Sequence, residues 1–239
     1  MFAALDIGNS YIKIQLFSAD KLINYYKFSH DEIGKISELF PISTAALSSV
    51  VPHITHKVIE IFKKINVLPF VISSGIKLNF KNLYKTPNTL GADRICNIAG
   101  AQTIGSTVKP KLVIDFGTAT NLNYINENNE FLGGVICPGI ATMKFSLLAK
   151  TSQLIDVEFD NSIVPLGKST SECIQSGIIY SQKGLIQEFI KSLGINLNDL
   201  EIFITGGFSN IMKDYLEFNF IHENKLSLIG IKKLYELNN

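Results

Sequence analysis

Short runs of alternating or apolar residues dominate the first third of the chain. Segments 2–8, 11–17 and 22–28 each have this pattern and are separated by turn residues, which predicts an antiparallel meander of three strands. The spacing of apolar residues then alternates between helical and strand-like. It predicts helices in 30–40 and 55–65 and strands in 44–50 and 69–73.

A second series of elements follows the small-residue and proline linker 105–110. Its predicted strands lie in 111–117, 119–125, 130–136 and 201–207, and its predicted helices in 139–149 and 168–193. Both series therefore begin βββ and continue with α and β. We interpret the chain as two copies of one half, with lobes at 1–107 and 108–239.

Composition narrows the range of functions. The chain has 239 residues, 46% hydrophobic and 18% charged, so it can bury a sizeable core. A net charge of +1 gives no electrostatic footprint for nucleic acid or an acidic membrane surface, so small molecules are the expected partners. Three cysteines without CxxC spacing favour a reducing compartment. No signal-like or membrane-spanning run is present, and we expect a cytoplasmic protein.

The two series carry matching chemistry. Asp6 ends one apolar run before Ile-Gly-Asn-Ser, and Asp115 ends another before Phe-Gly-Thr-Ala-Thr. Two facing copies would place both turns on one cleft, where glycine admits a phosphate and nearby hydroxyl and amide groups donate to it. A carboxylate beside phosphates predicts Mg²⁺ at Asp6, and Lys13 adds a positive charge. The alternative is that each motif is only a hairpin turn, with its Asp or Asn capping the local backbone.

Other phosphate- and metal-binding signals are weaker. The segment LGKST at 166–170 lacks the first glycine of a P-loop, because Ser162 occupies that position. The segment TGGFS at 205–209 suits either close packing against adenosine or a plain strand-to-helix turn. His53 and His56 have no third ligand nearby, so we assign them no metal.

The segment 84–95, YKTPNTLGADRI, is the most distinctive stretch. It places Asp93 beside Arg94, the only arginine among 22 Lys and Arg residues, just before a helical run. Arginine can bind a carboxylate with two parallel hydrogen bonds, and Asp93 can accept a proton from a hydroxyl that is being phosphorylated. The alternative is an aspartate at a helix start paired with a surface arginine.

The ordered motifs DIGNSYIK, YKTPNTLGADR, DFGTAT, FLGGVICPG, LGKSTSECIQSG and TGG resemble those of the type III pantothenate kinases. These belong to the acetate and sugar kinase, Hsp70 and actin superfamily. The resemblance spans essentially the whole chain and implies an α/β fold of two ribonuclease H-like, actin-like ATPase lobes of duplicated βββαβα type around a nucleotide cleft.

The resemblance also implies roles for individual residues. Asp93 is implied as the proton acceptor, Asp115 as the site of a monovalent cation (K⁺ or NH₄⁺), and Asp6 as the magnesium site through ATP. The ATP-binding residues implied are Asp6, Ile7, Gly8, Asn9, Ser10, Tyr11, Ile12, Lys13 and Thr118. The pantothenate-binding residues implied are Tyr84, Gly91, Ala92, Asp93, Arg94 and Thr170. The family is dimeric, and the Thr170 region is expected to complete the substrate site of the partner subunit.

The implied reaction is transfer of the ATP γ-phosphoryl group to the primary hydroxyl of pantothenate, giving 4'-phosphopantothenate, the first step of coenzyme A biosynthesis. One alternative is a kinase for another small hydroxy acid. Another is a non-catalytic regulatory protein of the same fold, because fold alone does not fix activity. The adjacent Asp93 and Arg94 argue against a protein freed from catalysis.

Overall fold

The computed structural model describes residues 1–19, 21–39, 41–150, 156–160 and 162–239. These form two compact units. The first contains 1–107, 129–132 and 225–239, and the second contains 108–128 and 133–224. Segments 129–132 and 225–239 thus belong to the first unit, whereas the boundary expected from sequence places them in the second lobe. The second of these segments joins the first unit because its helix packs closely against another helix there.

The first unit is built on a five-stranded sheet with the order β3-β2-β1-β4-β5. Strands β1, β2 and β3 are antiparallel, as the meander predicts, whereas β4 and β5 run parallel to β1. Its elements are β1 (Phe2–Ile7), β2 (Ile12–Ser18), β3 (Lys21–Phe28), η1 (His30–Glu38), β4 (Thr44–Ser49), α1 (Pro52–Lys63), β5 (Phe70–Val71), β6 (Lys81–Asn82), η2 (Pro87–Thr89), α2 (Ala92–Ile104) and α6 (Leu226–Asn238).

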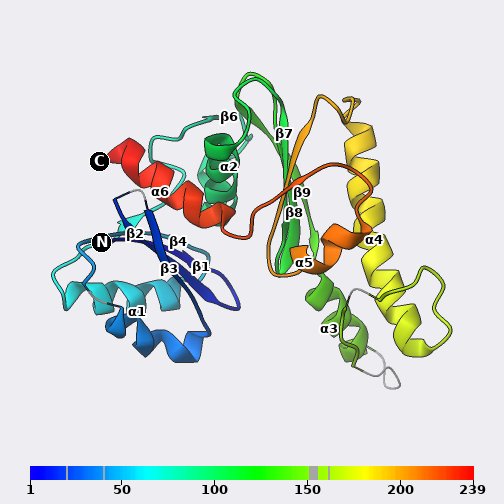
Figure 1. Cartoon of the computed structure of the whole chain (residues 1–239), viewed down its shortest axis with the longest axis horizontal. Coiled ribbons are helices and arrows are strands. Elements are labelled where there is room, and N and C mark those ends of the chain that lie inside the picture. Colours follow the sequence, from blue (N-terminus) through cyan, green and yellow to red (C-terminus); the bar gives the residue numbers. More distant parts are fainter. Residues whose placement is uncertain (20, 40, 151–155, 161) are drawn as a thin grey trace. The chain divides into compact units, whose positions relative to one another are not determined.

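Successive side chains of β1 point to opposite faces of the sheet. Leu5 and Ile7 join the core formed with α1 and η1 on one side of the sheet. Phe2 and Asp6 point to the other side, where Phe2 contacts Tyr235 of α6. Helices α6 and α2 cover that second side (Figure 1). Asp6 therefore faces a helical layer and not the main apolar core.

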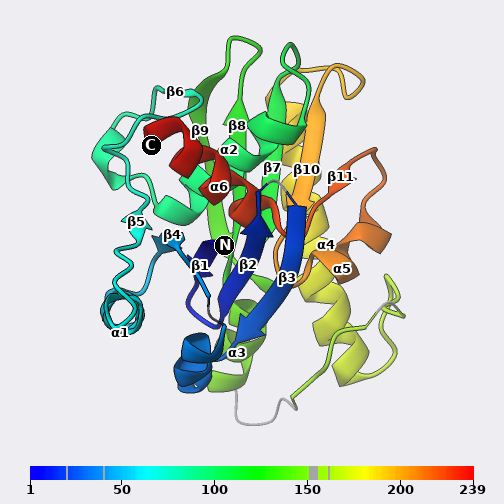
Figure 2. The same ribbon diagram turned by 60° about the vertical axis from the view of Figure 1, so that its left-hand side comes forward.

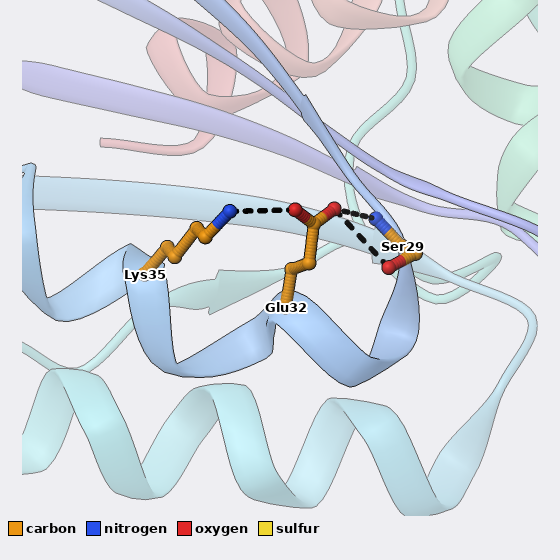
Figure 3. Close-up of polar contacts among 3 residues, drawn as sticks. All are labelled: Ser29, Glu32 and Lys35. Atoms are coloured by element: carbon orange, nitrogen blue, oxygen red, sulfur yellow. Dashed lines mark hydrogen bonds and ion pairs between the residues drawn. The ribbon is translucent and has the colours of Figure 1, made fainter.

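A charged capping box fixes the start of η1 (Figure 3). The backbone N–H and the hydroxyl of Ser29 both donate to Glu32 Oε2, at 3.0 and 3.1 Å, and Lys35 Nζ lies 2.6 Å from Glu32 Oε1. The Lys35 contact and the Ser29 donors lower the pKa of Glu32 to about 2. The helix therefore begins at a defined point directly after β3.

The second unit repeats the strand order as β9-β8-β7-β10-β11, with β7 and β8 antiparallel and β10 and β11 parallel to β7. Helices α4 and α5 cover one face of this sheet (Figure 2) and share a core with α3. Its elements are β7 (Lys111–Phe116), β8 (Ala119–Ile125), β9 (Glu130–Pro138), α3 (Ile140–Lys150), α4 (Thr170–Ser192), β10 (Glu201–Thr205), α5 (Ser209–Met212), η3 (Lys213–Tyr215) and β11 (Ile221–His222).

The start of β9 belongs to the first unit, although the rest of this strand belongs to the second. The first residues of β9 pair in parallel with β6, so that Lys81 lies opposite Glu130 and Asn82 opposite Phe131. Both segments belong to the first unit. Because of this pairing, Phe131 belongs to the first unit, whereas β9 from Gly133 onward belongs to the second. Within the described parts of the chain, no helix is long and apolar enough to cross a membrane.

Candidate active site

The turn after β1 is a tight hairpin whose acid points away from it. The Gly8 N–H donates to the Tyr11 carbonyl at 3.0 Å, which closes the turn, and His30 Nε2 donates to the Gly8 carbonyl at 2.9 Å. Asp6 instead accepts a hydrogen bond from the Ser227 hydroxyl at 2.7 Å. Asp6 is therefore not simply a cap for its own turn, although the turn itself is a hairpin.

Lys13 lies opposite Asp6 in the antiparallel register, and its Nζ is 4.0 Å from Asp6 Oδ2. The side chains are 26% and 13% exposed, so both remain partly open to solvent. In the same turn Asn9, Ser10 and Tyr11 are exposed. Ile7 and Ile12 are fully buried in the core, so only their backbone groups are available to a ligand.

The first turn of α2 brings Asp93 and Arg94 together. Gly91 precedes the helix, and a Cβ atom placed on it would lie 2.6 Å from Asp93 Oδ1, so the carboxylate folds back over the glycine. Burial raises the pKa of Asp93, hydrogen bonds from the Arg94 and Asp93 backbone lower it, and the charge of Asp6 raises it. The net result is a half-buried carboxylate that holds a proton more readily than an exposed aspartate.

Arg94 is not a surface residue. Its side chain is only 6% exposed, and its guanidinium carbon lies 5.4 Å from the ring centroids of both Tyr84 and Phe131. These two rings are themselves 5.7 Å apart. Arg94 is therefore buried and packs against two aromatic rings, and the surface-arginine interpretation is wrong. Phe131 is a residue that the sequence analysis did not assign to the site.

In the second unit, the turn that follows Asp115 packs closely against two glycines, Gly139 and Gly206. A Cβ atom on Gly139 would lie 2.2 Å from the Gly117 carbonyl oxygen, and one on Gly206, at φ +96°, would lie 2.5 Å from Asp115 Oδ1. The TGG segment therefore packs directly on the Asp115 turn. Thr118 accepts bonds through its carbonyl from the Gly139 N–H at 3.0 Å and the Thr142 hydroxyl at 2.6 Å, and Thr118 is itself exposed.

Thr170 is the first residue of α4 and is exposed. Ser169 caps this helix, its hydroxyl accepting from the Glu172 N–H at 3.3 Å. Thr118, Asp115 and Thr170 all belong to the second unit, whereas the Asp6 and Asp93 groups belong to the first.

A single carboxylate is available to the expected Mg²⁺ at the Asp6 turn. Among the described residues, no group of three or more His, Cys, Asp or Glu side chains forms a metal site. Mg²⁺ commonly takes only one or two carboxylates and completes its octahedron with water and substrate phosphates. Asp6 fits this pattern, because it is a single carboxylate that accepts a hydrogen bond from Ser227 at Oδ2 and is still 13% exposed.

These features define a class of protein. Two halves of the same strand order each carry a strand, an acid and a glycine turn, which is the actin-like ATPase and sugar kinase fold. Two solved structures share it. A Campylobacter jejuni protein assigned to the Baf family of transcriptional activators has 24% identity and a TM-score of 0.68 over 99% of this chain and 98% of that one. A Sinorhizobium meliloti protein assigned as a 2-dehydro-3-deoxygalactonokinase has 10% identity and a TM-score of 0.59 over 99% and 96%. At these identities the likeness shows the fold alone.

The sequence comparisons show the family. The sequence pattern described as "Type III pantothenate kinase" matches residues 2–192. A type III pantothenate kinase of Finegoldia magna is 32% identical over 98% of this chain and 96% of its own length. The chain therefore belongs to the type III pantothenate kinase family.

Proposed function

We propose that the protein catalyses ATP-dependent phosphorylation of pantothenate to 4'-phosphopantothenate, the first step of coenzyme A biosynthesis. Membership of the type III pantothenate kinase family supports this reaction. The observation that supports particular residues is the start of α2, where a carboxylate of raised pKa adjoins a buried arginine that packs against two aromatic rings.

Arg94 and Asp93 have separate tasks in this proposal. The Arg94 guanidinium binds the pantothenate carboxylate with two parallel hydrogen bonds, and the Tyr84 and Phe131 rings pack against it. Asp93 orients the primary hydroxyl and accepts its proton as the hydroxyl oxygen bonds to the γ-phosphorus. The bond from that phosphorus to the β,γ-bridging oxygen breaks, and ADP leaves with the electron pair. Gly91 and Ala92 approach the substrate from the same turn, and Thr170 contributes from the region assigned to the partner subunit.

The nucleotide is assigned to the turn from Asp6 to Lys13 and, through the family resemblance, to Thr118. Backbone N–H groups and the exposed Asn9 and Ser10 side chains bind phosphate oxygens there, and Lys13 offsets phosphate charge. Magnesium, held by Asp6, water and the phosphates, would neutralise the charge that develops on them.

Further features come from the family resemblance. Asp115 is proposed to hold K⁺ or NH₄⁺, which offsets a carboxylate at the end of a buried strand. The protein is proposed to be a homodimer in which the Thr170 end of α4 completes the partner's substrate site, and to act in the cytoplasm.

An ADP-release assay across a panel of small hydroxy acids tests the reaction. Pantothenate should give ADP formation far above the ATP-only rate, and hydroxy acids without its chain should not. A higher kcat/KM for another acceptor would make this a kinase for that compound. No acceptor-dependent ADP formation would favour a regulatory protein of the same fold.

A further inference from the structure

Asp6 is held by a residue that the family assignment gives no role. The Ser227 hydroxyl donates to Asp6 Oδ2 at 2.7 Å, across 221 positions of sequence. Ser227 is only 5% exposed and lies in the first turn of α6. This hydrogen bond joins the nucleotide turn to the last helix of the first unit.

The backbone position of Ser227 is fixed by an unusually close crossing of α6 with α2. A Cβ atom on Gly100 would lie 2.2 Å from the Leu226 carbonyl oxygen, and one on Gly230 would lie 1.8 Å from the Cys96 carbonyl oxygen. Glycine is therefore required on both helices, and the two close contacts, at Leu226 and Gly230, flank Ser227 along α6. Because α2 also carries Asp93 in its first turn, one helix pair sets the position of both acids.

The chemistry of the contact is directional. The hydroxyl donates its one proton in a hydrogen bond to Asp6 Oδ2, which restrains rotation of the carboxylate while the second oxygen is proposed to face the cation. Lys13 Nζ lies 4.0 Å from the same Oδ2, too far for a hydrogen bond. Lys13 and Asp6 thus form only a long ion pair, and without the serine hydroxyl the carboxylate is free to turn and shorten it. A closer ion pair would remove both groups from the magnesium-ATP complex.

We propose that Ser227 is a positioning residue for Asp6, holding its carboxylate in the orientation that binds magnesium-ATP. The inference rests on the proposed function, because it assumes that Asp6 serves the metal and nucleotide of that reaction. Partners that orient a metal-binding carboxylate commonly change metal affinity or activity by about 10- to 100-fold when they are removed.

Isothermal titration calorimetry of ATP binding tests the proposal directly, with Mg²⁺ and with EDTA. Ser227→Ala should weaken binding of magnesium-ATP by about 10-fold or more and leave metal-free ATP binding unchanged. Ser227→Thr keeps the hydroxyl and should restore most of the affinity. Thr103→Val is the matched control, because it removes a hydroxyl on α2 that donates only to the Ala99 carbonyl, at 2.7 Å. It should bind like the wild type.

The outcomes distinguish the positioning role of Ser227 from the proposed phosphorylation of pantothenate. Wild-type magnesium-ATP affinity in Ser227→Ala, or equal losses with Mg²⁺ and with EDTA, would overturn the positioning role. If circular dichroism shows that Ser227→Ala is unfolded, the same comparison in Ser227→Cys, which replaces the hydroxyl by a weak donor, decides the question. A wild-type protein that binds magnesium-ATP but does not phosphorylate pantothenate would refute the proposed function and leave the positioning of Asp6 standing.

Discussion

Replacing Arg94 by lysine isolates geometry from charge. Arg94 is 6% exposed and its guanidinium carbon lies 5.4 Å from each of two ring centroids, so packing restricts its movement before any substrate arrives. Lysine keeps the positive charge but presents one ammonium group in place of a planar fork. One of the two hydrogen bonds to a bound carboxylate is then lost.

The expected size of the effect follows from that one bond. A hydrogen bond to a charged group contributes about 1.5–3 kcal/mol, and about 1.4 kcal/mol corresponds to a tenfold change. Arg94→Lys should therefore raise the KM for pantothenate by about 10- to 100-fold while the KM for ATP stays near the wild-type value. With pantothenol, which has an alcohol in place of the carboxylate, Arg94→Lys should lower kcat/KM much less.

The assay is a comparison of kcat/KM for wild type and Arg94→Lys with pantothenate and with pantothenol. Phe131→Leu is a useful companion variant, because it removes one ring contact of about 0.5–2 kcal/mol and keeps the guanidinium fork. Phe131→Leu should lower kcat/KM for pantothenate less than Arg94→Lys does. Equal losses of Arg94→Lys on both substrates would refute the idea that this arginine reads the carboxylate.

Four further predictions concern the acids. Gly91→Ala would place a Cβ atom 2.6 Å from Asp93 Oδ1, so kcat should fall about 10-fold or more with little change in ATP binding; unchanged kcat would show that the carboxylate need not fold back. Because burial raises the pKa of Asp93, kcat/KM for pantothenate should fall on acidification with a midpoint above the value of about 3.9 for an exposed aspartate. For the same reason the fold favours neutral Asp93, so Asp93→Asn should raise the melting temperature at pH 7, an advantage that shrinks as the pH falls through the raised pKa. If Asp115 holds a monovalent cation, activity should depend on K⁺ or NH₄⁺, and equal rates in sodium-only buffer would contradict that role.

Local patterns predicted much of the fold because they depend on neighbours in sequence. The three-strand meanders and the long helices appear as the alternation and helical spacing require. Strands β6 and β11 contain two residues each, too few for any periodicity to be seen. They form because other strands offer them hydrogen-bonding edges, which is a property of the folded sheet.

The sequence marks candidate site residues only where their chemistry is local. Asp6, Asp93 and Arg94 stand out by residue type and spacing, but the burial of Arg94 depends on Phe131, which reaches the first unit through the pairing of β9 with β6. Ser227 is equally remote from Asp6 in sequence. No local pattern marks either residue, because both act through contacts made only in the folded chain.

The most direct test of the proposed reaction is the product formed by wild type and by Asp93→Asn under the same conditions. Pantothenate and magnesium-ATP should give 4'-phosphopantothenate, identified by mass spectrometry and by phosphorus NMR of a phosphate ester on the primary hydroxyl. Asp93→Asn should bind ATP normally and form product about 10²- to 10⁴-fold more slowly. Absence of the phosphorylated product with the wild type, or a rate for Asp93→Asn within a few-fold of wild type, would contradict the proposed catalytic site.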